Sequence, residues 1–321
     1  MVIITGAAGF IGSHLVDRLL ADGHRVIGID NFVRGSRDNI AEALADSRFT
    51  LIEADLADPD QVANVVEPML HDAADAEATV WHLAANSDIA AGVTDPQVDL
   101  RDTFLTTVNM LALMRRQGLR KLVFASTSAV YGETDAILAE DFGPLLPISS
   151  YGAMKLASEA AISAAAEAYL DQVWLCRFPN VIGGRSTHGV IYDLVGKLLK
   201  ATNQLEVLGD GTQCKPYLHV AELVDAMIFI RSRAGDKRAL YNIGPEDDGA
   251  NVRYIAEAVI AACGRDVEIH YTGGDRGWVG DVPRVKYSVD KLAGLGWRPA
   301  STSEKAVDLA VTQIFKERGV I

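Results

Sequence analysis

The pair of residues best suited to chemistry in this sequence is Tyr151 and Lys155, which lie four positions apart. Residues with this spacing share one face of a helix. A free tyrosine has a pKa of about 10 and is a weak base at neutral pH, whereas a nearby positive charge favours its phenolate form. The pair therefore predicts a proton-transfer site. Taken alone, it is also compatible with an ordinary aromatic residue and a solvated lysine.

A cluster of hydroxyl side chains, Ser126-Thr127-Ser128, follows an apolar run that reads as a strand. The Thr127 hydroxyl is a candidate to bond a substrate oxygen beside Tyr151. Hydroxyl clusters at strand ends are also common as local caps of the backbone, so the cluster alone supports both interpretations.

A glycine-rich turn, Gly6, Gly9 and Gly12, stands between the strand-like run Val2–Ile4 and a helical pattern. This is the context that a dinucleotide-binding fingerprint requires, with the pyrophosphate at the helix N-terminus. The spacing is G-x-x-G-x-x-G, and the alternative is an ordinary glycine-rich turn between a strand and a helix. The turn predicts a dinucleotide site.

An acidic residue, Asp30, ends the second predicted strand, where a carboxylate accepts hydrogen bonds from ribose hydroxyls. A carboxylate there repels a 2′-phosphate, so NAD is favoured over NADP, although Arg34 is a nearby cation. Asp55 either contacts the adenine or caps the helix before Pro59. The residues expected to contact the cofactor are Gly6, Gly9, Phe10, Ile11, Gly12, Asp30, Asn31, Arg34, Gly35, Asp55, Leu56, Leu83, Ala84, Ala85, Tyr151 and Lys155.

The elements that position these residues alternate between short apolar runs and amphipathic stretches. The predicted strands are Val2–Ile4, Arg25–Ile29, Phe49–Glu53, Thr79–Leu83, Lys121–Ala125 and Val173–Cys176. The predicted helices between them are Phe10–Ala21, Pro59–His71, Thr103–Gln117 and Tyr151–Tyr169. This alternation predicts an α/β fold with a doubly wound parallel sheet, which binds its ligand at the carboxyl ends of the strands.

The remainder of the chain is less regular and predicts a smaller α/β part that binds substrate. Its loops are rich in glycine, and its predicted helices are Ile191–Lys200, Val220–Ser232 and Val252–Cys263. We expect a cofactor-binding domain over 1–178 and a substrate-binding domain over 179–321, with chain segments that cross between them.

The composition and charge of the chain narrow its class. Hydrophobic residues make up 49% and charged residues 23% of the 321 residues, as in ordinary globular proteins. The formal net charge of −13 argues against nucleic acid or an anionic membrane surface as a partner. The three cysteines and seven histidines show no disulfide framework or metal-ligand spacing. With an apolar strand at its start and no apolar run of about 18 residues, we expect a cytoplasmic protein without a metal site.

The motifs together resemble those of the extended short-chain dehydrogenase/reductases, in the sugar-nucleotide epimerase/dehydratase group. The resemblance extends from Ile3 to Pro299. The matching segments are Thr5–Gly12, Asp30-Asn31, His82–Ala85, Ser126–Gly132, Tyr151–Lys155, Arg177–Val181, Gly209–Gln213 and Leu295–Pro299. The resemblance implies a Rossmann fold, NAD as cofactor, and Tyr151, Lys155 and Thr127 as catalytic residues.

Two residues after the threonine narrow the reaction within this group. Members that dehydrate resemble one another in an Asp-Glu pair there, and decarboxylating members carry a glutamate at the place of Ala129. This chain has Ser128-Ala129, which supplies no additional acid or base. The resemblance then implies C4 epimerisation of a UDP-hexose through a transient 4-keto sugar. Tyr151 removes the hydroxyl proton, Thr127 orients that oxygen, and NAD stays tightly bound.

The resemblance also implies where the UDP-sugar binds. Lys215 replaces the arginine of a Gln-x-Arg motif and is expected to hold the diphosphate with Arg276 and Asn180, although both cations also suit a solvated surface. Arg185 and Arg284 favour UDP-glucuronate, because a carboxylate at C6 prefers an arginine fork. UDP-glucose/UDP-galactose is the alternative. The expected substrate contacts are Ser126, Thr127, Ser128, Tyr151, Asn180, Arg185, Val190, Ile191, Leu208, Lys215, Tyr217, Arg276 and Arg284.

The sequence departs from the pattern of this group at two positions, and two other functions are compatible with it. Thr103 stands at the usual asparagine before the fifth strand, and Pro216 replaces an acidic residue. His14, His82 and His219 are expected to pack or to form hydrogen bonds.

The alternative functions are a net NAD-dependent oxidoreductase that releases NADH and a non-catalytic dinucleotide-binding regulator. By family analogy we expect a homodimer formed through Thr103–Gln117 and Tyr151–Tyr169.

Overall fold

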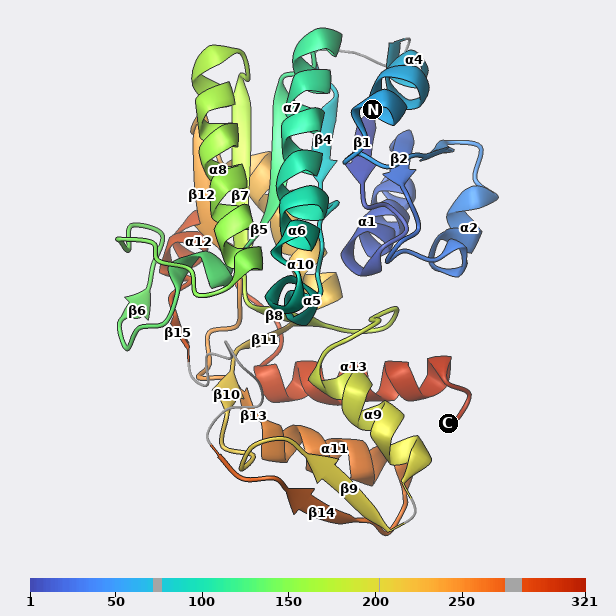
Figure 1. Ribbon diagram of the computed structural model, residues 1–321, viewed down its shortest axis with the longest axis vertical. Helices are drawn as coiled ribbons and strands as arrows, with labels where there is room; N and C mark the ends of the chain where they lie inside the picture. Colours follow the sequence, from blue (N-terminus) through green and yellow to red (C-terminus); the bar gives the residue numbers. More distant parts are fainter. Residues whose placement is uncertain (72–76, 202, 275–284) are drawn as a thin grey trace. The chain divides into compact units, whose positions relative to one another are not determined.

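A computed structural model describes residues 1–71, 77–201, 203–274 and 285–321 of the chain. The chain forms two compact units (Figure 1). The first contains Met1–Gly132, Pro144–Arg177 and Met227–Tyr241, and the second contains Glu133–Gly143, Phe178–Ala226 and Asn242–Ile321. The chain therefore passes between the units several times, and each unit is described here by itself.

The first unit is built on a seven-stranded sheet with the order β12-β7-β5-β4-β1-β2-β3. Its strands are β1 (Val2–Thr5), β2 (Val26–Asp30), β3 (Phe49–Glu53), β4 (Thr79–His82), β5 (Lys121–Thr127), β7 (Gln172–Phe178) and β12 (Arg238–Asn242). The pairs from β3 across to β5 are all parallel, with Ile3 opposite Ile27 and Val80. The order reverses beside β1, so loops after β1 and β4 diverge to opposite faces and leave room for a ligand. The predicted doubly wound sheet is confirmed.

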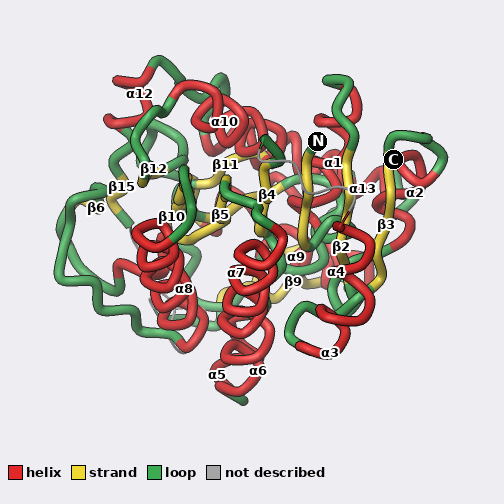
Figure 2. Tube along the Cα trace, turned by 90° about the horizontal axis from the view of Figure 1, so that it is seen from above, coloured by secondary structure: helices red, strands yellow, loops and turns green. Residues whose placement is uncertain are grey.

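Helices cover both faces of this sheet, with α7 and α8 on one face and α1 on the other (Figures 1 and 2). The helices of the first unit are α1 (Phe10–Ala21), α2 (Ala41–Leu44), α3 (Pro59–Gln61), α4 (Glu67–Leu70), α5 (Ile89–Thr94), α6 (Pro96–Asp99), α7 (Thr106–Gln117) and α8 (Ser150–Ala168). Short 3₁₀ turns span Arg37–Ile40 and Ser128–Tyr131, and π-helical turns span Val62–Val66 and Leu100–Leu105.

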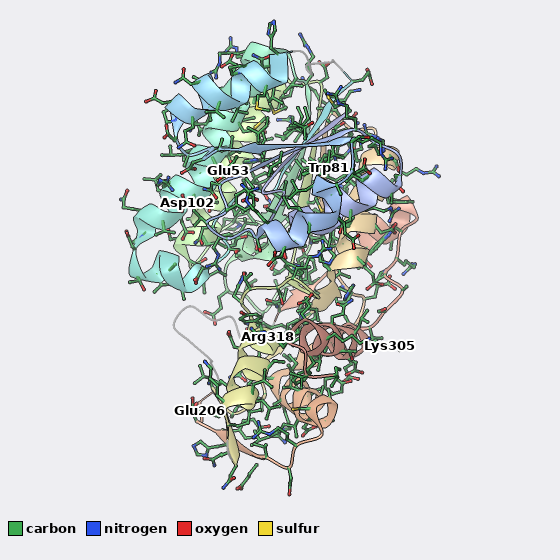
Figure 3. All side chains as sticks on the ribbon, turned by 90° about the vertical axis from the view of Figure 1, so that its right-hand side faces the viewer. Glu53, Trp81, Asp102, Glu206, Lys305 and Arg318 are labelled. Carbon is green, nitrogen blue, oxygen red and sulfur yellow. The ribbon has the colours of Figure 1, made fainter. Side chains whose placement is uncertain are left out.

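Burial on both faces explains the apolar strands. Every residue of β1, β2 and β4 is buried, and the side chain of Trp81 lies inside the unit (Figure 3). Strands between two helical layers must be apolar along their whole length, which the sequence of these strands satisfies. The polar residues at the strand ends, such as Thr5 and Asp30, then stand out as candidates for binding.

The second unit contains short strand pairs packed with helices α9, α11 and α13. Its elements are β6 (Ile137–Leu138), β8 (Asn180–Ile182), α9 (Val190–Lys200), β9 (Gln204–Val207), β10 (Cys214–Lys215), β11 (Tyr217–His219), β13 (Ala250–Asn251), α11 (Val252–Cys263), β14 (Glu268–Tyr271), β15 (Lys286–Tyr287), α12 (Asp290–Leu295) and α13 (Ser303–Glu317). Helix α10 (Val220–Arg233) begins in this unit and ends in the first. Buried aliphatic side chains such as Leu194, Val259 and Val311 form its core. Among the described residues, none of the helices has the length and apolar character needed to span a membrane.

Candidate functional site

The glycine-rich turn after β1 is built around close backbone contacts. A Cβ on Gly12 would lie 1.9 Å from the Gly6 carbonyl oxygen, so no other residue fits at that position. Gly6 has a φ of +69°, and a Cβ on it would come within 3.0 Å of the Ala84 backbone nitrogen, so a glycine is favoured there. Gly9 is the N-cap residue of α1 and has no side chain to cap the helix, so the N–H groups of the first turn are available to an anion. This cradle fits the pyrophosphate of a dinucleotide.

The carboxylate of Asp30 lies at the end of β2, next to this turn. Asp30 Oδ2 accepts a hydrogen bond of 2.8 Å from the Ala8 N–H, and Oδ1 accepts one of 2.8 Å from the Phe32 N–H. Burial raises the pKa of Asp30, and these backbone donors partly offset that rise. A carboxylate oxygen has further lone pairs, so the fixed group can still accept hydrogen bonds from ribose hydroxyls.

The loop after Asp30 holds the other residues predicted to contact the adenosine. The Asn31 side chain accepts a hydrogen bond from the Val33 N–H, and Phe32 has a φ of +58°. Gly35 lies so close to Asp30 that a Cβ would come within 2.8 Å of Oδ1. The Arg34 guanidinium pairs with Asp88 at 3.5 Å, so its charge is directed at another carboxylate.

The alternative role considered for Asp55, a cap of the helix before Pro59, is wrong. Asp58 caps that helix, because its side chain accepts hydrogen bonds from the N–H groups of Asp60 and Gln61. Asp55 instead accepts a bond from the Ala57 N–H and pairs with Arg101. Leu56 is buried next to it, and its carbonyl accepts a hydrogen bond from the Asn109 side chain.

The backbone after β4, from Leu83 to Ala85, is anchored by Thr5. The N–H groups of Leu83 and Ala84 both donate to the Thr5 hydroxyl at 3.1 Å. That hydroxyl also bonds His82, whose other ring nitrogen meets Thr107. Burial lowers the pKa of His82 to about 3, with the Lys155 charge as a second cause, so the ring is neutral. His82 thus forms hydrogen bonds as predicted. Thr5 begins the matching segment Thr5–Gly12, but it was not among the residues expected to contact the cofactor.

Helix α8 brings together Lys155, which is buried, and Tyr151, which is partly exposed, within the first unit. Ser149 caps this helix through the Gly152 N–H, which places Tyr151 in its first turn. Lys155 Nζ lies 5.9 Å from the centre of the Tyr151 ring and 4.7 Å from that of Phe124. Burial raises the pKa of Tyr151, opposed by a hydrogen bond with Thr127, and burial lowers the pKa of Lys155 to about 7. A bound cation such as the nicotinamide ring would favour the phenolate further.

The hydroxyl cluster separates into three different environments. Thr127 ends β5 and accepts a hydrogen bond of 3.1 Å from the Ala129 N–H, so its own proton is left to donate. Its contact with Tyr151 joins the ends of β5 and α8. Ser128 begins the following 3₁₀ turn. Ser126 is buried and bonds Glu159, which directs its hydroxyl into the protein interior.

A buried ion pair beneath this site was not anticipated from the sequence. Arg177 on β7 donates to both carboxylate oxygens of Glu159, at 2.9 Å and 2.6 Å, and both side chains are less than 10% exposed. The Arg177 guanidinium also lies 4.8 Å from the centre of the Tyr131 ring. Glu159 follows Lys155 by one helical turn, and this spacing was the signal that could have identified it.

The residues predicted to bind the UDP-sugar lie mostly in the second unit. Asn180 and Tyr217 are paired across the parallel strands β8 and β11, and Lys215 lies on β10, two residues before Tyr217. Val190 and Ile191 begin α9, and Leu208 follows β9 with 49% of its surface exposed. Arg185 has a φ of +64°, and its N–H donates to Glu317 of α13. Arg276 and Arg284 lie outside the described residues.

The chain is similar to known proteins over most of its length. Residues 2–244 match the model of the NAD dependent epimerase/dehydratase family. The UDP-glucose 4-epimerase of Mycolicibacterium smegmatis is 31% identical, with 92% of this chain and 93% of that relative covered. A solved UDP-galactose 4-epimerase is 35% identical, with a TM-score of 0.85 over 98% of this chain and 99% of the other.

The Thermus thermophilus UDP-glucose 4-epimerase, solved as a complex with NAD, is 30% identical. Its TM-score is 0.84, with 100% of this chain and 99% of the other covered. The glycine cradle beside β1, the carboxylate at the end of β2 and the extent of these matches lead to one assignment. The chain belongs to the NAD-dependent epimerase/dehydratase family of enzymes.

Proposed function

We propose that this protein inverts the configuration at C4 of a UDP-hexose, with UDP-glucose and UDP-galactose as the pair that it interconverts. The observation that carries the reaction is the enclosure of Tyr151 with Lys155 and Thr127 at the end of β5, where a doubly wound sheet presents its ligand site. The proposed sugar pair is taken from the names of relatives at least 30% identical to this chain, among them the Mycolicibacterium smegmatis enzyme and the two solved structures described above.

When bound, NAD would accept a hydride from C4 of the sugar and return it to C4, so the reaction is redox-neutral overall. Residues of the chain carry out the proton transfer and hold the sugar. Tyr151 takes the proton from the C4 hydroxyl, and positive charge on the nearby Lys155 and on the nicotinamide favours its phenolate form. The Thr127 hydroxyl, which accepts the Ala129 N–H, has its own proton left to donate to the same oxygen. After the 4-keto sugar turns about its diphosphate linkage, Tyr151 returns the proton.

The second unit is proposed to hold the diphosphate and the uracil. Lys215 and Asn180 provide an ammonium and an amide on neighbouring strand pairs, and a lysine binds a phosphate as a point charge. Val190 and the exposed Leu208 offer apolar surface for the base, whereas Ile191, expected to contact it, is 2% exposed and packs in the core of the second unit. Because the sugar is then tethered by its diphosphate, it can present either face of the ketone without leaving the enzyme.

UDP-glucuronate is a second candidate substrate. Arg185 has a backbone conformation in the left-handed region, and its N–H is fixed by Glu317. Such strained residues cluster at binding sites, which supports a functional role for this side chain. Its guanidinium suits a C6 carboxylate. The other residue that favours this sugar, Arg284, lies outside the described residues.

The experiment that tests the function is NMR of the purified protein with UDP-glucose and, separately, with UDP-glucuronate, without added NAD. We expect UDP-glucose to be converted to UDP-galactose. Faster conversion of UDP-glucuronate would replace the substrate and keep the mechanism. Accumulation of free NADH in proportion to product would favour a net oxidoreductase. No turnover of either sugar, even with NAD added, would contradict the proposal and favour a non-catalytic regulator.

We also propose a homodimer formed through α7 and α8. The π-helical turn and α7 expose apolar side chains at Leu105 and Val108, 38% and 37% of whose surfaces are accessible. Light scattering at micromolar concentration should give twice the mass of the chain, and Val108→Glu should yield monomers. A monomeric wild-type protein would contradict this proposal.

A further inference from the structure

One buried ion pair of the first unit contacts both ends of the threonine segment (Ser126–Tyr131), which carries the threonine of the proposed reaction. At the start of the segment, the Ser126 hydroxyl donates a hydrogen bond to Oε1 of Glu159. At its end, the Tyr131 ring centre lies 4.8 Å from the guanidinium of Arg177. Arg177 in turn donates to both carboxylate oxygens of Glu159, so one pair of side chains fixes the segment at two places.

The burial of this pair indicates what it contributes. Glu159 is 6% exposed and Arg177 is 4% exposed. Taking two charges out of water is costly, and apolar side chains of similar volume often give equal or greater stability. A buried ion pair is therefore a weak device for stability. What it provides beyond apolar side chains is a set of directed hydrogen bonds, and here these bonds end on the threonine segment.

The threonine segment also lies directly against the start of helix α8. A Cβ on Gly152 would come within 2.7 Å of the carbonyl oxygen of Ala129, so the two backbones pass each other immediately after Tyr151. The N–H of the same Ala129 donates to the Thr127 hydroxyl at 3.1 Å. A displacement of the segment would therefore move the Thr127 hydroxyl relative to Tyr151.

We propose that Glu159 is a positioning residue for the proton transfer, which acts through Ser126 on the neighbouring Thr127. Its carboxylate is fixed by Arg177, holds the Ser126 hydroxyl, and so sets where the Thr127 hydroxyl meets the substrate oxygen. Ser126 was expected to contact the substrate, but its single hydroxyl proton is directed at Glu159 and is not left for a substrate oxygen. The inference rests on the proposed function, because it assigns this contact to the same reaction.

The test uses Ser126→Ala, which removes the hydrogen bond to Glu159 and leaves the ion pair with Arg177 in place. The matched control is Ser158→Ala. Ser158 is another fully buried serine, and its hydroxyl donates to the Met154 carbonyl within helix α8. Each substitution removes one buried serine hydroxyl, so a general loss of packing would affect the two variants alike.

The first measurement needs no UDP-sugar and does not depend on the proposed function. Hydrogen exchange at the Ala129 amide of the NAD-bound protein follows the bond between that N–H and the Thr127 hydroxyl. In Ser126→Ala we expect this exchange to become about 10-fold faster, because the start of the segment is released. Ser158→Ala should exchange as the wild type does. Unchanged exchange in a folded Ser126→Ala protein would overturn the inference.

The second measurement is steady-state kinetics with the UDP-sugar that the wild type converts. We expect kcat to fall about 10-fold in Ser126→Ala with KM within about 2-fold, since the change displaces Thr127 and not the groups that hold the diphosphate. In a Thr127→Ala background, Ser126→Ala should have little further effect, because the hydroxyl through which it acts is absent. Equal losses in both backgrounds would overturn the inference and leave the Ser126 contact purely structural.

Two further outcomes are decided by the same design. A wild type that converts neither UDP-glucose nor UDP-glucuronate would contradict the proposed function, and exchange at Ala129 alone would then decide whether Glu159 fixes Thr127. If Ser126→Ala does not fold, Ser126→Cys replaces the hydroxyl with a weaker donor of similar shape. It should give smaller changes in the same direction.

Discussion

Lys155 Nζ donates a hydrogen bond of 2.7 Å to the carbonyl oxygen of Ala125 and lies 5.9 Å from the centre of the Tyr151 ring. The C-terminal part of strand β5 and the first two turns of helix α8 are therefore joined through one ammonium group. Because the carbonyl fixes the lysine, the charge that acts on Tyr151 has a defined position. The geometry of the acid–base pair therefore depends on the carboxyl end of strand β5 as well as on helix α8.

Replacing Tyr151 with phenylalanine should abolish most of the activity while NAD remains bound. General acid–base catalysis contributes about 10²- to 10⁴-fold, and we expect kcat to fall within that range. The control is Tyr169→Phe at the other end of α8, whose hydroxyl donates to the Leu111 carbonyl and is remote from the reaction. Unaltered kcat in Tyr151→Phe, with the cofactor content confirmed by absorbance, would exclude Tyr151 as the acid or base.

The NAD-free protein should become more stable as the pH rises through the neutral range, because Lys155 is buried. Its pKa is about 7 in the folded protein, whereas an ordinary lysine has 10.5. Between these values the unfolded chain binds the extra proton, so the free energy of unfolding increases with pH. Urea unfolding between about pH 7 and 9 measures this slope. Lys155→Met should reduce it, and Lys197→Met, at an exposed ion pair, should not.

The Asp30→Asn substitution should weaken NAD binding by about 10- to 100-fold, since hydrogen bonds to a charged group contribute about 1.5–3 kcal/mol. With the carboxylate gone, NADP should lose less affinity than NAD, or gain some, because the repulsion of a 2′-phosphate is removed. Calorimetric titration with both cofactors measures the ratio. Asp38→Asn, an exposed acid in the turn that follows, serves as the control. Equal losses for the two cofactors would argue against a ribose contact.

The Glu159–Arg177 pair should show strong coupling in a double-mutant cycle. Arg177→Met leaves a carboxylate buried without its partner, which costs about 3–5 kcal/mol of stability. Adding Glu159→Leu to that variant removes the uncompensated charge, so the double variant should be more stable than Arg177→Met. Urea unfolding of the four proteins measures the coupling. Additive losses would mean that the two side chains act independently.

Much of the fold was predictable because burial leaves a local record in the sequence. Strand β3 and helices α1 and α11 have the predicted bounds, and the other predicted strands of the sheet differ by one or two residues at either end. In contrast, β12 was missed, because Arg238–Asn242 is a single short run that pairs with β7 far away in the sequence. Nothing local distinguishes such a strand from a loop.

In the candidate site, too, features with a local sequence pattern were predicted and features that depend on tertiary contacts were not. The spacing of Tyr151 and Lys155 and the strand-end position of Asp30 were sufficient to single them out. The Glu159–Arg177 pair was not found, because its side chains come from α8 and β7 and meet only in the folded chain. The cap of α3 was also misplaced, since Asp55 and Asp58 both precede Pro59 and only the backbone direction decides between them. Side chains that come into contact only through the tertiary fold have no characteristic spacing in the sequence, so the sequence alone does not reveal their contact.

The contribution of β12 to the sheet of the first unit has a consequence for how the chain is made. Residues up to Phe178 emerge from the ribosome with β7 as an unpaired edge, and its partner strand follows only at Arg238. An exposed, apolar edge strand invites pairing with other chains. The nascent protein must therefore shield this edge through the synthesis of some 60 further residues, and a fragment ending at Phe178 would be expected to aggregate.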